Sequence, residues 1–220
     1  MRQRCILLRF IPQASRLPYN VWMFPQARTD SACVFHGRRF DVHQVGLPGD
    51  DGRVHLRELV VHPGAVVVLA LVDGVPGRER VAMIRNERFA VAETLWELPA
   101  GTLEPGEDPT ACAARELIEE SGYRAGQIRP LTRFFTTPGI CTELMWAFVA
   151  EDLEHVGQRL EASERITVEV VELDRTMQMV KTGEIRDGKT IAALLYYQMF
   201  KRHGLDPRSP LDPGRPRSNR

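Results

Sequence analysis

Apolar runs of strand length dominate the first two thirds of the chain. The run AVVVLALVDG at 65–74 is continuously apolar and predicts a buried strand. The segment ERVAMIRNERFA at 79–90 follows the turn GVPGR and predicts a neighbouring strand. Other segments rich in β-branched and aromatic residues predict further strands, at 33–47, 53–62, 94–101, 128–139, 142–153 and 164–173. The segments 33–47 and 53–62, joined by PGDDG, are expected to form an antiparallel hairpin.

Helical patterns occur at three places, 108–121, 174–184 and 189–200. The first is the best delimited. Asp108 suits the N-cap, Pro109 suits the first helical position, and Gly122 suits the left-handed residue that ends a helix. Many strands with few helices, not strictly alternating, favour a mixed α/β or α+β fold over a doubly wound parallel sheet.

The two ends of the chain differ in composition from its middle. Residues 1–29 hold five arginines and no acidic residue. We interpret residues 1–30 as a flexible leader or a misassigned start, with Met23 as the alternative first residue; an organelle transit peptide is the other interpretation. Residues 204–220 are rich in proline, arginine and serine and are predicted to be disordered.

Charge and cysteine content narrow the class of protein. The 29 basic residues equal the 29 acidic ones, so no overall basic field favours nucleic-acid binding. No run approaches the roughly 18 apolar residues of a membrane span. The cysteines show no CxxC motif or Cys/His cluster, which disfavours both a zinc site and a disulfide framework and favours a reducing cytoplasm. They are Cys5, Cys33, Cys112 and Cys141.

Three glutamates of the helix at 108–121 raise a physical question. Glu116, Glu119 and Glu120 have i, i+3 and i+4 spacing, so an α-helix places them on one face, where like charges repel. A bound Mg²⁺ or Mn²⁺ would remove this repulsion, because these ions take carboxylate and phosphate oxygens. Arg115 and Glu107 lie close enough in sequence to join the cluster. The alternative is an ordinary solvated glutamate face.

The wider pattern around this helix resembles the Nudix box, G-x5-E-x7-R-E-U-x-E-E-x-G-U, where U is apolar or aromatic. Every conserved position of that motif is matched, by Gly101, Glu107, Arg115, Glu116, Leu117, Glu119, Glu120, Gly122 and Tyr123. The resemblance implies an α/β/α sandwich with a mixed β-sheet. It also implies metal-dependent hydrolysis of a nucleoside diphosphate linked to another group.

The resemblance also implies roles for individual residues. The metal ligands would be Glu116 and Glu120, assisted by Glu107, Glu119 and the carbonyl of Ala100. Arg115 would position the glutamates. By this resemblance residues 64–203 form the Nudix domain, and residues 31–63 form an N-terminal β-hairpin that builds a homodimer.

The flanking segments are similar to the ADP-ribose pyrophosphatase branch of the family. They are ELPAG before the box, TTPGICTE after it and GEIRDGKTIAALL near the C-terminus. For ADP-ribose the products would be AMP and ribose 5-phosphate. Two alternatives remain. One is the same chemistry on GDP-mannose or a UDP-sugar, and the other is a nucleotide-binding domain of this fold without turnover.

Candidate substrate contacts lie outside the box. Arg85 and Arg88 follow an apolar strand and are candidates for the diphosphate or the terminal ribose, or are surface arginines. Pro138 and Gly139 are candidates for shaping the substrate pocket, or form only a hairpin turn. Glu143 is a candidate ribose contact.

The resemblance places the catalytic base in the loop LEASERI. Glu164 is the best match for that base and Glu161 the second. Some relatives carry an acid where this chain has Ala162, so the loop is less acidic than in those relatives. Both the assignment of the base and the number of metal ions therefore stay open.

Overall fold

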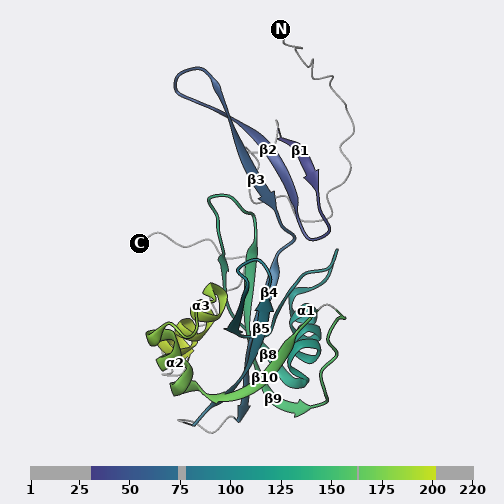
Figure 1. Cartoon of the computed structure of the whole chain (residues 1–220), viewed down its shortest axis with the longest axis vertical. Helices are drawn as coiled ribbons and strands as arrows, with labels where there is room; N and C mark the ends of the chain where they lie inside the picture. The colour runs from purple at the N-terminus through teal and green to yellow at the C-terminus, as the bar shows by residue number, and fades with distance from the viewer. Residues whose placement is uncertain (1–30, 74–77, 163, 202–220) are drawn as a thin grey trace, which may run out of the picture.

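The computed structural model describes residues 31–73, 78–162 and 164–201. The predictions made for residues 1–30 and 204–220 lie outside these ranges. Within them the chain forms a small three-stranded sheet and a larger α/β body, drawn above and below one another in Figure 1.

The small sheet, called the N-terminal sheet below, is antiparallel. Its strands are β1 (Ser31–His36), β2 (Asp41–Pro48) and β3 (Val54–Val61), in the order β1-β2-β3. The segment 33–47, predicted as one strand, is two strands separated by a tight turn. That turn is closed by the amide of Gly37, which donates to the carbonyl of Phe40 at 3.1 Å.

The larger sheet has seven strands and is mixed, as the sequence predicted. Its main path runs β10-β5-β4-β9-β8, and β6 and β7 pair with β5 and β4. The β4–β9 pair is parallel and the other pairs are antiparallel. The strand bounds are β4 Ala65–Asp73, β5 Arg80–Arg88, β6 Glu93–Glu97, β7 Ala100–Thr102, β8 Tyr123–Phe135, β9 Leu144–His155 and β10 Ile166–Glu172.

Helices cover both faces of this sheet, α1 on one side and α2 and α3 on the other (Figure 1). Their bounds are α1 Pro109–Glu116, α2 Leu173–Thr182 and α3 Gly188–Tyr196, with π-helical turns η2 (Leu117–Ser121) and η3 (Tyr197–Lys201) after α1 and α3. In the described ranges, no helix combines the length and the apolar character needed to cross a bilayer.

Strand β4 shows why the body is a sandwich. Its residues Val67 and Leu69 pack in one core cluster with Leu194 of α3. The alternate residues Val66 and Val68 pack in a second cluster with helix α1. Successive side chains of a strand point to opposite faces, so a continuously apolar strand requires cover on both faces. The predicted α/β/α sandwich is thereby confirmed.

The loop between β8 and β9 joins the two sheets. The amide of Val60 in β3 donates to the carbonyl of Ile140 at 2.8 Å, and the amide of Thr142 donates back to Val60 at 3.0 Å. The Thr142 hydroxyl also accepts from the amide of His62 at 2.9 Å. These bonds attach the end of the N-terminal sheet to the α/β body.

Candidate active site

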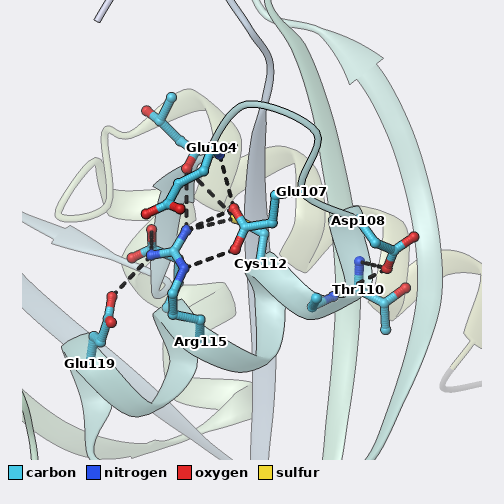
Figure 2. Close-up of polar contacts among 10 residues, drawn as sticks. Glu104, Glu107, Asp108, Thr110, Cys112, Arg115 and Glu119 are labelled. Atoms are coloured by element: carbon cyan, nitrogen blue, oxygen red, sulfur yellow. Dashed lines mark hydrogen bonds and ion pairs between the residues drawn. The ribbon is translucent and has the colours of Figure 1, made fainter. Parts of the chain in front are cut away.

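Helix α1 starts where the sequence predicted. The Asp108 carboxylate accepts from the amides of Thr110 at 2.8 Å and Ala111 at 3.2 Å, as Figure 2 shows in part. Pro109 occupies the first turn, where no amide donor is required. At the other end, Gly122 adopts φ 74°, a left-handed conformation that glycine tolerates well.

The helix changes from α to π at Leu117, immediately after Glu116. The three glutamates of this segment differ in exposure. Glu116 and Glu120 are only 9% and 4% exposed, whereas the Glu119 side chain is 36% exposed. Short π-helical turns inside α-helices are frequent at functional sites. On the predicted glutamate face, Glu116 and Glu120 are therefore the buried pair and Glu119 lies at the edge.

Arg115 connects the acidic residues of the box (Figure 2). Its guanidinium binds both carboxylate oxygens of Glu107, at 2.9 and 3.0 Å. Its third nitrogen donates to Glu116 at 2.7 Å and to Glu119 at 3.0 Å. The hydrogen bonds from Arg115 are the main reason that the pKa of Glu107 is lowered to about 2. Arg115 and the box glutamates Glu107, Glu116 and Glu119 thus form one network.

Gly101 of β7 allows Glu116 to lie against the sheet. A Cβ atom at residue 101 would be 1.9 Å from the carboxyl carbon of Glu116, a distance that non-bonded atoms do not reach. Any side chain at residue 101 would force the Glu116 carboxylate out of its present position. The first glycine of the box pattern therefore has a direct steric role at the carboxylate site.

Glu120 lies deeper than the other acids. Its carboxylate accepts from the Ala100 amide at 2.8 Å. The pKa of Glu120 is raised to about 8, mainly by burial, with a further contribution from the nearby charges of Glu116 and Glu164. Burial is also the main reason that the pKa of Glu116 is raised. Two buried carboxylates offer oxygen ligands only, which fits a hard divalent cation such as Mg²⁺ or Mn²⁺.

The buried pair opens into a cleft of about 1060 Å³. Glu161 and Glu164, from the loop before β10, also line this cleft. Glu164 is half-buried, and its carboxylate accepts from the amide of Glu161 at 2.9 Å. Glu164 is near enough to raise the pKa of both Glu116 and Glu120. The structure therefore brings Glu164 toward the buried carboxylates of Glu116 and Glu120, while Glu161 is exposed.

Arg88 lines the same cleft but is already engaged. Its guanidinium donates twice to the buried carboxylate of Glu97, at 2.7 and 2.6 Å. Lys189 of α3 donates to the same carboxylate at 2.5 Å. Burial opposes ionisation of Glu97, but the two cations outweigh it and lower its pKa. Arg88 uses two of its five N–H donors here, so others stay available for an anionic ligand.

The remaining candidates lie elsewhere. Arg85 stacks over Trp96 at 5.3 Å and borders a shallow depression beside the main cleft. Pro138 and Gly139 are exposed in the loop that docks on β3, and within the described ranges neither lines the cleft. Glu143 accepts from the Thr136 hydroxyl at 2.5 Å and lies 3.6 Å from His62, which lines the cleft, although Glu143 itself does not.

The structure adds cleft residues that sequence reasoning missed. Arg38, Arg39 and Phe40, in the turn between β1 and β2, line the cleft although they belong to the N-terminal sheet. Two adjacent arginines at a tight turn were visible in the sequence as GRRF. Only the docking of the two sheets places them opposite the box.

Comparison with known proteins agrees with this geometry. The NUDIX domain matches residues 61–194. The chain therefore belongs to the Nudix family, and its conserved motif is the α1–η2 segment with Gly101 and Glu107.

Two curated relatives and one solved structure illustrate the similarity. The chain is 37% identical over 168 residues to an ADP-ribose pyrophosphatase of Bacillus subtilis (strain 168), covering 76% of this chain and 89% of that protein. It is 36% identical over 176 residues to a GDP-mannose pyrophosphatase of Escherichia coli O1:K1 / APEC, covering 73% and 88%. The crystal structure of an ADP compounds hydrolase superposes with a TM-score of 0.69 at 22% identity, covering 80% and 94%. That last similarity supports the fold.

Proposed function

We propose that this protein is a divalent-metal-dependent pyrophosphatase that hydrolyses ADP-ribose or a closely related nucleoside diphosphate sugar. The observation that carries the proposal is the buried Glu116–Glu120 pair at the cleft, with Arg115 connecting Glu116 to Glu107 and Glu119. A purely structural helix gains nothing from burying two like charges, because each loses its hydration. A cation that binds substrate phosphate compensates that cost.

We infer that the cation is Mg²⁺ or Mn²⁺. The residues that would hold it are Glu116 and Glu120, with Glu119, Glu107 and the Ala100 carbonyl as further candidates. When bound, such an ion neutralises phosphate oxygens and lowers the pKa of a water molecule. Arg115 keeps Glu107, Glu116 and Glu119 in place by charge-assisted hydrogen bonds.

The remaining steps belong to side chains of the cleft. Glu164 accepts the proton of the water that attacks one phosphorus of the diphosphate, because it is the loop acid whose charge acts on the buried pair. Arg88, Arg38 and Arg39 line the cleft with positive charge and bind the diphosphate. With ADP-ribose as substrate, the products are AMP and ribose 5-phosphate.

The second candidate substrate is GDP-mannose, which the 36% identity to a GDP-mannose pyrophosphatase favours. The same carboxylates would act on the diphosphate of either substrate, so contacts to the nucleobase and to the sugar would determine which substrate is preferred.

We further propose that the protein is a homodimer in a reducing cytoplasm. In the described ranges, the cysteines Cys33, Cys112 and Cys141 are all free thiols, which supports that compartment.

A substrate panel tests the proposal. The purified chain is incubated with Mg²⁺ or Mn²⁺ and ADP-ribose, GDP-mannose, UDP-glucose or NADH, and phosphatase-coupled phosphate release is measured. We expect turnover of ADP-ribose, strictly dependent on the metal. Faster turnover of GDP-mannose would select the second candidate. Tight binding of these nucleotides with turnover of none would overturn the enzymatic proposal in favour of a nucleotide-binding domain.

A further inference from the structure

Strands β1 and β2 bring four possible metal ligands together as two cross-strand pairs. Cys33 lies directly opposite His43, and His36 lies directly opposite Asp41. Residues directly opposite in an antiparallel pair share a face of the sheet, with Cβ atoms about 5 Å apart. Each pair therefore projects from one face, and the two pairs are adjacent along the strands.

A β-bulge places both pairs on the same face. Cys33 and His36 are three residues apart, so a regular strand would point them to opposite faces. The register shifts between Cys33 and Phe35, which inserts one extra residue into β1. Asp41 and His43 on the partner strand are two residues apart and share a face without any irregularity. The bulge thus aligns Cys33 and His36 with them, and bulges commonly re-aim side chains at functional positions.

The ligand atoms of three of these residues are already close together. The Cys33 Sγ lies 3.4 Å from the His36 Nδ1, which lies 3.3 Å from an Asp41 carboxylate oxygen. One ligand atom from each of the three residues lies within 4.8 Å of the others. With the usual zinc bond lengths, tetrahedral ligand atoms are about 3.3–3.6 Å apart. The two short separations fall in that range.

We propose that Cys33, His36, Asp41 and His43 form a zinc site, with His43 as the fourth ligand. A thiolate with two imidazoles suits a borderline-soft cation such as Zn²⁺, and disfavours Mg²⁺, which prefers oxygen ligands. The site is thus chemically distinct from the carboxylates of the box. The absence of a CxxC motif does not exclude it, because its ligands are paired across two strands.

The proposed zinc site lies at the turn that contributes residues to the cleft. The four ligands bracket the turn that carries Arg38, Arg39 and Phe40, which line the cleft. A metal ion bound to both strands restricts this turn to one conformation. The zinc site therefore stabilises the wall of the cleft opposite the box and takes no part in hydrolysis.

Cobalt substitution tests the proposal independently of the enzymatic activity. The chelator-treated full-length protein is titrated with Co²⁺ in the presence of excess Mg²⁺. We expect one Co²⁺ per chain with a thiolate-to-cobalt charge-transfer band, displaced by Zn²⁺. Carboxylates alone cannot produce that band, so a metal ion at the box does not imitate it. The band should also persist in a Glu116→Gln/Glu120→Gln variant.

Single substitutions identify the ligands. Cys33→Ser should abolish the band, while Cys141→Ser, which removes another partly buried thiol, should retain it. His36→Ala, Asp41→Asn and His43→Ala should each weaken Zn²⁺ binding at least about 10-fold, with circular dichroism verifying the fold. Absence of the band, or its survival in Cys33→Ser, would overturn the site. Unchanged Zn²⁺ affinity in His43→Ala would overturn the four-ligand assignment.

Discussion

Glu116 and Glu120 destabilise the metal-free fold although the proposed function requires their charge. Both carboxylates are buried, and burial raises the pKa of each. In the metal-free protein such groups oppose folding whenever they are ionised, because water solvates the charge better than the interior does. Burial of both carboxylates, with Glu116 packed against Gly101, is favourable only if a cation binds there.

The substitution Glu120→Gln separates these two effects. Glutamine preserves the shape and can still accept from the Ala100 amide, but it cannot carry the charge. We expect metal-dependent hydrolysis to fall by at least about 10²-fold, and the melting temperature of the metal-free protein to stay equal or rise. Activity assays and thermal unfolding in chelator measure the two quantities. Near-normal activity would contradict the metal-site assignment.

Glu164 and Glu161 provide a second test at the level of single side chains. Both line the cleft, but Glu164 is the one that influences Glu116 and Glu120. We expect Glu164→Gln to lower kcat by about 10²–10⁴-fold, the usual contribution of a general base. Glu161→Gln is the matched comparison and should change kcat much less. Steady-state kinetics with ADP-ribose across pH would show the loss of the base-dependent limb only for Glu164→Gln. The reverse ranking would assign the base to Glu161.

The helix of the box illustrates what sequence can and cannot predict about an element. Its N-cap at Asp108 and its end at Gly122 depend on local chemistry, and both are confirmed. The π turn after Glu116 depends on how the helix packs between strands, so the i, i+4 pattern could not predict it. As a result, the burial of Glu120 and the outward position of Glu119 emerge only from the structure.

The strands show the same limit. The buried β4 and its antiparallel neighbour β5 follow from their apolar runs and are confirmed. The break of the first predicted strand at Gly37–Phe40 was missed, although that turn supplies arginines to the cleft. The bulge after Cys33 was missed as well. Both features depend on pairing between strands, which hydrophobic periodicity along one segment does not reveal.

The end of β6 carries an ion-pair network that yields a pH prediction. The folded pKa of Glu97 is lowered: burial raises it, but Arg88 and Lys189 outweigh that effect. A pKa that is lower in the folded protein stabilises the fold at pH values above the pKa of glutamate in the unfolded chain, about 4.3. This stabilisation is lost as the pH falls through the folded-state pKa. We expect the wild-type free energy of unfolding to fall on acidification below about pH 5, with a smaller decrease in Glu97→Gln.

Urea unfolding between neutral and acidic pH measures this difference. At neutral pH we expect Glu97→Gln to be destabilised by about 1–3 kcal/mol, because the half-buried Arg88 and Lys189 lose the fully buried carboxylate that both bind. Glu93→Gln is the control, since Glu93 lies on the same strand and pairs with Arg186 at the surface. It should cost at most about 1 kcal/mol. Equal effects of the two substitutions would contradict a structural role for the buried network.

At the scale of the whole molecule, the described part of the N-terminal sheet carries large apolar side chains that stay exposed. Phe35, Val54 and Leu56 of the N-terminal sheet are 56%, 68% and 54% exposed. The strand register places them on the face opposite the four proposed zinc ligands, because Phe35 pairs with Val42 rather than Asp41, and Leu56 pairs with Gly46. These three exposed apolar side chains thus share one face of the small sheet, called the apolar face below, which also carries the opposed pair Gln44 and Glu58.

A second copy of the chain is the partner that we expect on this apolar face, in agreement with the homodimer proposed above. Burial of three large apolar side chains per chain favours association, and a charge in the middle of that face opposes it. We expect the wild type to sediment at about twice the 24.9 kDa chain mass, and Leu56→Asp to sediment as a monomer with its core intact. Val170→Asp, which alters an exposed apolar residue of β10, should remain dimeric. A wild-type protein that stays monomeric at high concentration, or a Leu56→Asp variant that still dimerises, would exclude this face as the interface.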